Sequence, residues 1–334
     1  MPSRRELTDR RGFGVLGMGH YLPARVIDNA HIAQRANVTE EWILAKTGVQ
    51  QRHRAAEGET TADLGAEAAR HALKDAARRA MTPIATAPPE MVVFATSTPD
   101  RQLPAPVFDL HQRLGLPHIP ALSIDGACAG FAQGMLTSYG YFHAGMAETS
   151  LVVGAHRSGI LLDESNPKVA PLIGDGGGAF LMGEVPAGYG IIGYEMLTDS
   201  SYSEVVCTPA RGSVPVDREF MEMDGGRLME IFAREMPRMI DSALAQCDLT
   251  VADIDHLVLH QANVRMVEVF SAALELPPER VGTSGRSVGN TSAASLPIGL
   301  VVTDMERPIE RDSIVVFATA GSGVCGAVVV MRWF

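Results

Sequence analysis

The chain has 334 residues, of which 46% are hydrophobic and 20% charged, a composition typical of a folded protein long enough for two core-forming units. Its net charge of -11 argues against a general nucleic-acid binder, which would present a basic face. The four cysteines form no CxxC pair, which excludes a zinc ribbon or a thioredoxin-type motif. Residues 1–11 are polar and do not resemble a secretory signal, so a reducing, cytoplasmic location is expected.

The first half of the chain predicts strands alternating with helices. Residues 13–18 are expected to form the first strand. Residues 12–17 match GxGxxG, but they lack the preceding strand and following helix that a dinucleotide site needs. Residues 174–178 form a glycine-rich turn that lacks the Gly-Lys-Ser/Thr of a phosphate-binding loop, so ATP is not implied. The other expected elements are helices at 39–43, 60–81 and 104–114, and strands at 91–96, 120–124, 150–154 and 179–182.

A similar series of elements recurs in the second half. It comprises a strand from residue 188, an amphipathic helix at 227–247, a strand at 256–260, a small-residue helix from 290, and strands at 314–318 and 327–332. The uncharged stretch 313–331 is interrupted by glycines, so it predicts two strands rather than a membrane helix. The recurrence predicts two related α/β halves, 1–186 and 187–334, with mostly parallel sheets and buried helices sandwiched between them.

Three polar side chains are predicted at the ends of buried elements. Cys128 follows the buried strand 120–124 and begins a small-residue helix, His260 ends a buried strand, and Asn290 begins the equivalent helix of the second half. The positive end of a helix stabilises a thiolate. A histidine supplies proton exchange, and side-chain donors stabilise an oxyanion. The pattern therefore predicts nucleophilic acyl transfer at Cys128.

Two other chemistries are excluded by order and context. Residues 285–289 match the GxSxG elbow of serine hydrolases, but no histidine follows His260, whereas that fold places its catalytic histidine after the serine. His256 and His260 have the spacing of a zinc peptidase, but they lie in an apolar strand and lack the adjacent glutamate. No metal site is expected.

Four motifs, in order along nearly the whole chain, resemble those of the β-ketoacyl-acyl-carrier-protein synthase III family within the thiolase superfamily. The first surrounds Trp42, Gly48 and Arg52, and the others are ACAGF at 127–131, HQAN at 260–263 and GNTSAAS at 289–295. The resemblance implies a five-layered αβαβα thiolase-like fold of two pseudo-duplicated halves. It also implies a homodimer, without nucleic-acid or membrane partners, that catalyses decarboxylating Claisen condensation.

The resemblance also implies a role for each of the three polar residues. Cys128 takes an acyl group from acyl-CoA as a thioester. His260 and Asn290 then bind the thioester carbonyl of malonyl-acyl-carrier protein and stabilise the carbanion left by loss of carbon dioxide. The backbone N–H groups of Cys128 and Gly323 hold the second oxyanion. CoA thioesters are the substrates in this scheme, and no metal or redox cofactor is expected.

The same resemblance places the substrate-binding residues and shows where this chain differs. The expected CoA and pantetheine contacts are Trp42, Lys46, Gly225, Asn263 and Arg265. Pro167 falls near the place of an arginine that usually sandwiches the adenine, and Lys168 beside it can supply only a point charge. Leu103 and Val324 replace larger aromatic residues of the acyl pocket, which predicts acceptance of medium-chain or bulky acyl groups.

Two other functions remain open on the sequence alone. One is a Cys-dependent acyltransferase of secondary metabolism that moves an acyl group onto a hydroxyl or amine without forming a carbon–carbon bond. Asn290 argues against it, because simple transfer has no carbanion to stabilise. The other is a degenerate subunit that only binds a partner, which the three retained polar residues disfavour, because unpaired buried polar groups destabilise a fold.

Overall fold

The computed structural model describes residues 11–79, 87–208 and 220–334. Its main sheet has nine strands, and the strands at its centre, β8 and β1, pair only between Phe13 and Gly190. This narrow link divides the sheet into a C-terminal half (β11 to β8) and an N-terminal half (β1 to β5). The order across the sheet is β11 (His256–Leu259), β12 (Ile314–Gly321), β13 (Cys325–Arg332), β8 (Gly190–Thr198), β1 (Gly12–Tyr21), β7 (Gly176–Val185), β6 (Thr149–His156), β4 (Met91–Ala95) and β5 (Ala121–Ile124).

The two halves repeat one pairing pattern, as expected for a duplicated fold. In the N-terminal half β4 runs parallel to β6, while β7 is antiparallel to both β6 and β1. In the C-terminal half β11 runs parallel to β12, while β13 is antiparallel to both β12 and β8. The prediction of mostly parallel sheets is therefore wrong. The four longest ladders are antiparallel, because β7 and β13 return beside the preceding strand without a helical crossover.

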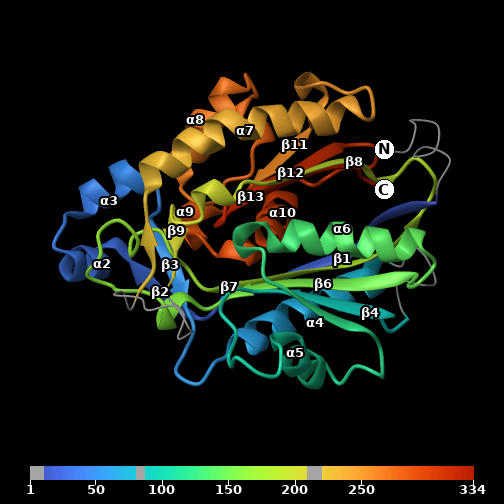
Figure 1. Cartoon of the computed structure of the whole chain (residues 1–334), viewed down its shortest axis with the longest axis horizontal. Helices are drawn as coiled ribbons and strands as arrows, with labels where there is room; N and C mark the ends of the chain where they lie inside the picture. The colour runs from blue at the N-terminus through green and yellow to red at the C-terminus, as the bar shows by residue number, and fades with distance from the viewer. Residues whose placement is uncertain (1–10, 80–86, 209–219) are drawn as a thin grey trace.

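Helices cover both halves and fill the space between them (Figure 1). The outer face of the N-terminal half carries α4 (Thr61–Arg79) and α5 (Pro106–Leu114), and that of the C-terminal half carries α7 (Gly225–Ala245) and α8 (Val264–Ala273). Between the halves lie α6 (Gly130–His143) and α10 (Ser295–Glu306). The predicted five-layered αβαβα architecture is confirmed; the boundary at residue 186 stays a prediction.

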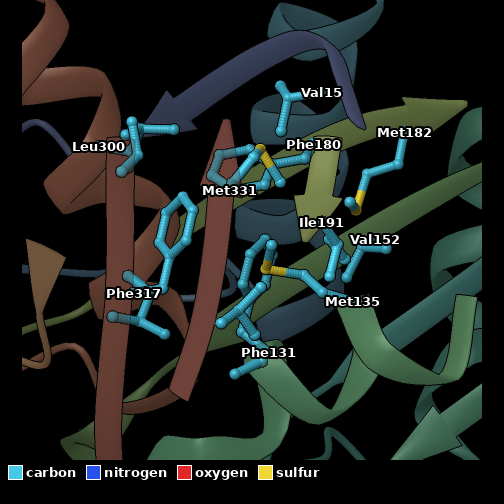
Figure 2. Packing of buried hydrophobic residues seen from close by; sticks show 14 of the residues in the cluster. Val15, Phe131, Met135, Val152, Phe180, Met182, Ile191, Leu300, Phe317 and Met331 are labelled. Atoms are coloured by element: carbon cyan, nitrogen blue, oxygen red, sulfur yellow. The ribbon is translucent and has the colours of Figure 1, made fainter. Parts of the chain in front are cut away.

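The central core joins both halves through aromatic side chains (Figure 2). Phe131 on α6 lies edge-on to Phe180 on β7, with ring centroids 5.0 Å apart, and Phe180 lies 6.0 Å from Phe317 on β12. All three side chains are fully buried. Burial of each stabilises the fold by about 1.5–3 kcal/mol, so this row of rings fixes the middle layer against both sheets.

The glycines of the first strand serve packing rather than nucleotide binding. A Cβ atom on Gly17 would collide with the backbone of Ala72 and Ala76, and one on Gly19 with the backbone of Ala68 and Ala72. The alanine-rich helix α4 therefore lies directly on β1. Of the other two glycines in the GxGxxG match, Gly12 packs against the backbone of residues 185–189 and Gly14 against Val185 and Gly190, so all three serve close packing.

Smaller elements complete the chain. The capped helix expected near Trp42 is α3 (Glu40–Thr47), where the Thr39 side chain accepts a hydrogen bond from the Trp42 N–H. Other short elements were not predicted from sequence: α2 (Asn29–Ala36), α9 (Gly285–Val288), the pair β2 (Arg25–Asp28) and β3 (Gln51–Arg54), and the pair β9 (Val206–Cys207) and β10 (Glu222–Met223). The 3₁₀ turns are η2 (Ala127–Ala129), η3 (Ser158–Ile160), η4 (Ser200–Tyr202), η5 (Val251–Asp253), η6 (Pro278–Arg280) and η7 (Ser292–Ala294).

Two predictions about apolar segments have different outcomes. Residues 313–331 form β12 and β13, joined by a glycine-containing turn, as predicted. Strand β5, expected to be buried, is instead an edge strand with only partly buried side chains, because β4 is its one neighbour. Within the part of the chain that the structure describes, no helix is both long and apolar enough to cross a bilayer.

Candidate active site

Cys128 lies on the 3₁₀ turn η2, immediately before the buried helix α6. The turn begins at Ala127, whose φ of 46° is uncommon for a residue with a side chain. Strand β12 from the other half reaches this turn. The Thr319 hydroxyl donates to the carbonyl oxygen of Cys128 at 3.0 Å, and a Cβ on Gly321 would lie 2.9 Å from the Cys128 nitrogen. The nucleophile candidate is thus held by both halves of the molecule.

The second half contains a matching turn, η7, before the buried helix α10. It also begins with a left-handed residue, Ser292 at φ 50°. The same number of residues separates Met91 from His256, Ala127 from Ser292, Gly130 from Ser295, and Thr149 from Ile314. By this spacing the counterpart of Cys128 is Ala293, not Asn290 as predicted. The error arose because Asn290 precedes its turn, whereas Cys128 lies within its own.

Asn290 is fixed by its backbone and by its side-chain oxygen. Its N–H donates to the Leu172 carbonyl and its carbonyl accepts from the Gly174 N–H, both at 2.8 Å. Its Oδ1 accepts from the Ser292 N–H at 2.9 Å. With the oxygen engaged, the Nδ2 amide group is left to donate to a ligand.

The three predicted residues come together where η2 and η7 meet. The sulfur of Cys128 lies 3.6 Å from the Ser292 hydroxyl, two residues from Asn290. His260 follows β11, and its N–H donates to the Ala318 carbonyl at 2.9 Å, one residue from the threonine that holds Cys128. The segments that carry the three residues therefore adjoin one another at β12 and the two touching turns.

Burial governs the charge of the sulfur. It raises the pKa of Cys128 to about 11, and the hydrogen bond with Ser292 opposes the rise only in part. Burial therefore opposes the thiolate that the start of a helix was expected to favour, because the anion loses its solvation in the interior. The thiol carries its proton until substrate arrives.

His260 is held neutral by the same environment. Burial, followed by the field of His156, lowers the pKa of His260 to about 3. The residue is 5% exposed, and its Nδ1 has no hydrogen-bond partner among the described residues. A neutral imidazole protonated on Nε2 can donate a hydrogen bond to a substrate oxygen without carrying charge.

A buried arginine supports the loop that carries Asn290. Arg52 is fully buried and donates to Asn29 Oδ1 at 2.9 Å and to the Pro171 carbonyl at 2.7 Å. A Cβ on Gly289 would lie 3.2 Å from the Cβ of Arg52. Burial lowers the pKa of Arg52 to about 10, which leaves the guanidinium charged at neutral pH. Arg52, from the first sequence motif, therefore supports the loop at Gly289 that carries Asn290.

Sequence reasoning missed His156, the last residue of β6. It is 2% exposed, and burial lowers its pKa to about 4 despite the opposing field of Asp175. The sequence could have indicated this residue. His156 lies two residues past the predicted buried strand 150–154, and His260 was singled out because it ends a predicted buried strand.

A cavity of about 1270 Å³ opens beside this cluster. All five residues predicted to bind CoA or pantetheine line it: Trp42, Lys46, Gly225, Asn263 and Arg265. Its wall also includes Leu172, whose carbonyl accepts from Asn290, and Ala262, two residues after His260. Cys128, His260 and Asn290 are not among the residues that line the cavity, which adjoins them through Leu172 and Ala262.

The cavity wall carries charges of both signs. Pro167 and Lys168 are among its residues, as are Glu204, Glu222 and Asp224. Arg265 is already engaged within the chain: it forms an ion pair with Glu268 at 2.8 Å and donates to the Leu44 carbonyl at 3.1 Å. The indole of Trp42 is free enough to stack on a ligand, since the residue is 37% exposed.

The structure separates the two residues predicted to line the acyl pocket. Val324 is buried against Val205 and Ile231, just after the β12–β13 turn that contains Gly323. Leu103 is 82% exposed and lies on the surface ahead of α5. Within one chain, therefore, only Val324 lies near the turn against which Cys128 packs.

The residues behind the two alternative chemistries make other contacts in the structure. Ser287 lies in the short helix α9, where its hydroxyl donates to the Ser284 carbonyl instead of standing on an exposed elbow. His256 Nδ1 is 2.8 Å from the Arg307 guanidinium. Among the residues placed by the structure, no group of His, Cys, Asp and Glu could hold a metal ion.

Comparison with known proteins gives one consistent result. Residues 122–200 match the family profile described as 3-oxoacyl-[acyl-carrier-protein] synthase III, and residues 244–333 match that of its C-terminal domain. The chain is 35% identical over 322 residues to a β-ketoacyl-[acyl-carrier-protein] synthase III of Geobacillus kaustophilus, covering 96% of this chain and 99% of that one. A protein of the same description from Laribacter hongkongensis is 34% identical, covering 92% and 95%.

Solved structures show the same relationship. A 3-oxoacyl-(acyl carrier protein) synthase III of Pseudomonas aeruginosa superposes with a TM-score of 0.89 at 30% identity, covering 97% of this chain and 98% of that one. The priming β-ketosynthase of the R1128 polyketide pathway superposes with a TM-score of 0.87 at 27% identity, covering 100% and 98%.

Proposed function

The chain belongs to the 3-oxoacyl-[acyl-carrier-protein] synthase III family, and from that premise we propose that Cys128, His260 and Asn290 carry out its acyl transfer and condensation. The enzyme is an acyl-transferring condensing enzyme. The observation that supports this assignment of roles is the meeting of η2 and η7, which places the thiol 3.6 Å from the hydroxyl of Ser292, beside Asn290.

The first half-reaction loads the cysteine. The sulfur of Cys128 attacks the carbonyl carbon of an acyl-CoA, the new carbon–sulfur bond forms, and the bond to the CoA sulfur breaks. CoA leaves as its free thiol, which carries the proton that Cys128 gives up. Because burial raises the pKa of Cys128 to about 11, the proton departs as the acyl bond forms rather than in advance.

The second half-reaction joins the two carbon chains. His260 and Asn290 donate hydrogen bonds to the thioester carbonyl of the malonyl group, whose bond to the carboxylate breaks with loss of carbon dioxide. The electron pair remains as an enolate, attacks the acyl carbon on Cys128, and forms the new carbon–carbon bond. The backbone N–H groups of Cys128 and Gly323 hold the resulting oxyanion until the thiolate of Cys128 leaves and takes up a proton.

The entrance cavity supplies the binding site for the substrate arm. Trp42 would stack on the adenine of CoA, while Lys46 and Arg265 would face its phosphates and Gly225 and Asn263 its pantetheine. CoA and carrier-protein thioesters serve as substrates in this scheme, and the steps need no metal or redox cofactor, because every bond change is an acyl transfer or a decarboxylation.

The acyl pocket of the proposed enzyme is completed by a second copy of the chain. Leu103 is 82% exposed and Phe108 on the adjacent helix is 55% exposed, a pair of apolar side chains suited to a homodimer contact. We propose that Leu103 reaches the partner's acyl pocket. Its modest size, together with Val324, favours medium-chain or bulky primers over acetyl alone, in keeping with the similarity to a priming ketosynthase.

Release of carbon dioxide from a malonyl thioester, dependent on an acyl-CoA, tests the proposal. The wild-type protein should release it in step with 3-oxoacyl product, and Cys128→Ala should abolish product. A protein that acylates Cys128 but passes the group only to hydroxyl or amine acceptors would be the Cys-dependent acyltransferase instead. That alternative is not favoured, because it leaves His260 and Asn290 without a carbanion to stabilise.

A further inference from the structure

His156 faces the same interior space as the three proposed catalytic residues. Alternate residues of a strand share a face, so Val152, Gly154 and His156 point to one side of β6. Val152 belongs to the central core between the sheets, and a Cβ on Gly154 would lie 2.6 Å from the Ala293 carbonyl of η7. His156, two residues further along, therefore points toward the middle layer at the level of the turn beside Asn290.

The internal duplication gives His156 a counterpart in the other half of the chain. The spacing that relates η2 to η7 also relates His156 on β6 to Gly321 on β12. Gly321 is the residue whose missing side chain lets β12 press against the Cys128 nitrogen. Where one half has a glycine against the nucleophile turn, the other half has an imidazole at the corresponding end of its strand.

His156 and His260 approach the start of α10 from opposite sheets. His260 follows β11, and the next residue, Gln261, donates its N–H to the hydroxyl of Ser295, the first residue of α10. Gly154 on β6 packs against η7, directly ahead of that helix. The field of His156 also reaches His260, where it lowers the pKa of that imidazole.

Both imidazoles carry a nitrogen that the described chain leaves unsatisfied. Nδ1 of His156 and Nδ1 of His260 are buried without a hydrogen-bond partner among the described residues. Such groups are rare, and a bridging water between two polar atoms is the usual way to satisfy them. Two charged groups also act on His156. Asp175 accepts from the backbone and hydroxyl of Ser158 and from the Ala55 N–H. Arg54 donates through Nη1 to the Ile173 carbonyl and lies 3.8 Å from Asp175, while its Nη2 is buried without a partner among the described residues.

We propose that His156 is a positioning residue of the condensing site, which holds His260 in the tautomer protonated on Nε2 by donating, through one bridging water, to Nδ1 of His260. The inference rests on the proposed function. With its Nδ1 occupied as an acceptor, His260 presents Nε2–H to the malonyl thioester carbonyl. The contribution of His156 falls on the decarboxylation step and not on acylation of Cys128.

Two substitutions of His156 test the proposal. His156→Asn keeps a hydrogen-bonding group close to the backbone, whereas His156→Phe keeps the ring volume and removes both nitrogens. Three quantities are measured on each full-length protein: acylation of Cys128 from acyl-CoA by mass spectrometry, kcat and KM for malonyl-thioester decarboxylation, and the ¹⁵N imidazole signals of His260. Thermal unfolding shows that each variant is folded.

In His156→Phe we expect kcat for decarboxylation to fall about 10-fold, the effect of losing one hydrogen bond to a reacting group, with KM and acylation unchanged. The ¹⁵N signals of His260 should shift toward a mixture of tautomers, and His156→Asn should stay within about 3-fold of wild type. Unchanged decarboxylation with unchanged signals overturns the proposal, as does an equal loss of both half-reactions, which would mean a structural role. Wild-type protein without decarboxylation overturns the proposed function instead, and the ¹⁵N signals still decide whether His156 governs the tautomer.

Discussion

Cys128 is the proposed nucleophile, yet its buried environment disfavours the thiolate form in the absence of substrate. Burial raises the pKa of Cys128 to about 11, while the Ser292 hydroxyl at 3.6 Å partly offsets that effect. Because the thiolate is the reactive form, we expect the free thiol to react slowly with alkylating reagents. Reactivity therefore depends on substrate excluding water and accepting the proton.

The hydroxyl of Ser292 should be measurable in the reactivity of the free enzyme. Because its hydrogen bond lowers the pKa of Cys128, Ser292→Ala should raise that pKa further and leave less thiolate at any pH below about 11. Iodoacetamide labelling of the peptide containing Cys128, followed from pH 7 to 10, should be slower in the variant throughout. Ser287→Ala is the control, since its hydroxyl binds only the nearby Ser284 carbonyl. Equal labelling rates in Ser292→Ala and wild type would contradict the assigned role of Ser292.

Asn290 offers a test that separates the two half-reactions. Asn290→Ala removes one of two proposed donors to the malonyl carbonyl and should lower decarboxylation by about 10²–10³-fold. Acylation of Cys128 should proceed at close to the wild-type rate, because the first oxyanion is held by backbone N–H groups. Mass spectrometry of the acyl-enzyme and carbon dioxide release give the two rates. Loss of acylation in the folded variant would show that Asn290 acts on the first step as well.

At the scale of elements, close packing of helices on strands explains most of the glycine pattern. Helix α4 lies so close to β1 that Gly17 has the backbone of Ala72 and Ala76 where a side chain would go. In the buried helix α6, by contrast, a methyl group added to Gly140 near the C-terminal end would meet no neighbouring atom within 4 Å. The same residue type thus has a packing role in one element and none in the other.

This difference predicts opposite effects of one substitution. Gly17→Ala should lower the free energy of unfolding by about 1–3 kcal/mol, because α4 must move away from β1. Gly140→Ala should leave it unchanged or raise it by up to about 1 kcal/mol, because alanine favours a helix over glycine. Urea unfolding of the two variants measures both. A Gly17→Ala protein as stable as wild type would show that the contact between α4 and β1 is loose.

At the scale of the whole molecule, the proposed active site depends on contact between the two similar halves. Turn η2 packs against β12, while η7 packs against β6, and the two turns meet each other. Neither half contains the complete site, since Cys128 lies in one, and His260 and Asn290 lie in the other. The narrow link between β1 and β8 is thus reinforced by the shared middle layer and its row of phenylalanines.

The proposed homodimer carries its own prediction at this scale. Leu103→Phe should narrow the partner's acyl pocket, so that the rate of Cys128 acylation by a medium-chain acyl-CoA falls about 10-fold relative to that by acetyl-CoA. Met305→Phe, at another exposed apolar position, is the matched control and should change neither rate. Light scattering should give the mass of two chains. A monomer, or equal chain-length preference in both variants, would rule out a contribution of Leu103 to the partner.

The sequence by itself predicted most strands of the main sheet, the longer helices, the recurrence of two similar halves, and the candidate residues Cys128, His260 and Asn290. These predictions follow from local periodicity and from the placement of small residues. The five-layered fold was implied by the family resemblance of four motifs that keep their order along the chain. The five cavity residues were also predicted from motifs, and the structure brings all of them to one cavity.

Only the tertiary structure decided features that depend on contacts between distant segments. The long antiparallel ladders, the correspondence of Cys128 with Ala293, the bracing of Gly289 by Arg52 and the position of His156 all arise where segments from both halves meet. The protonated state of Cys128 belongs here too. Local sequence specifies a helix end that favours the thiolate, whereas the burial that raises the pKa of Cys128 comes from residues far away in the chain.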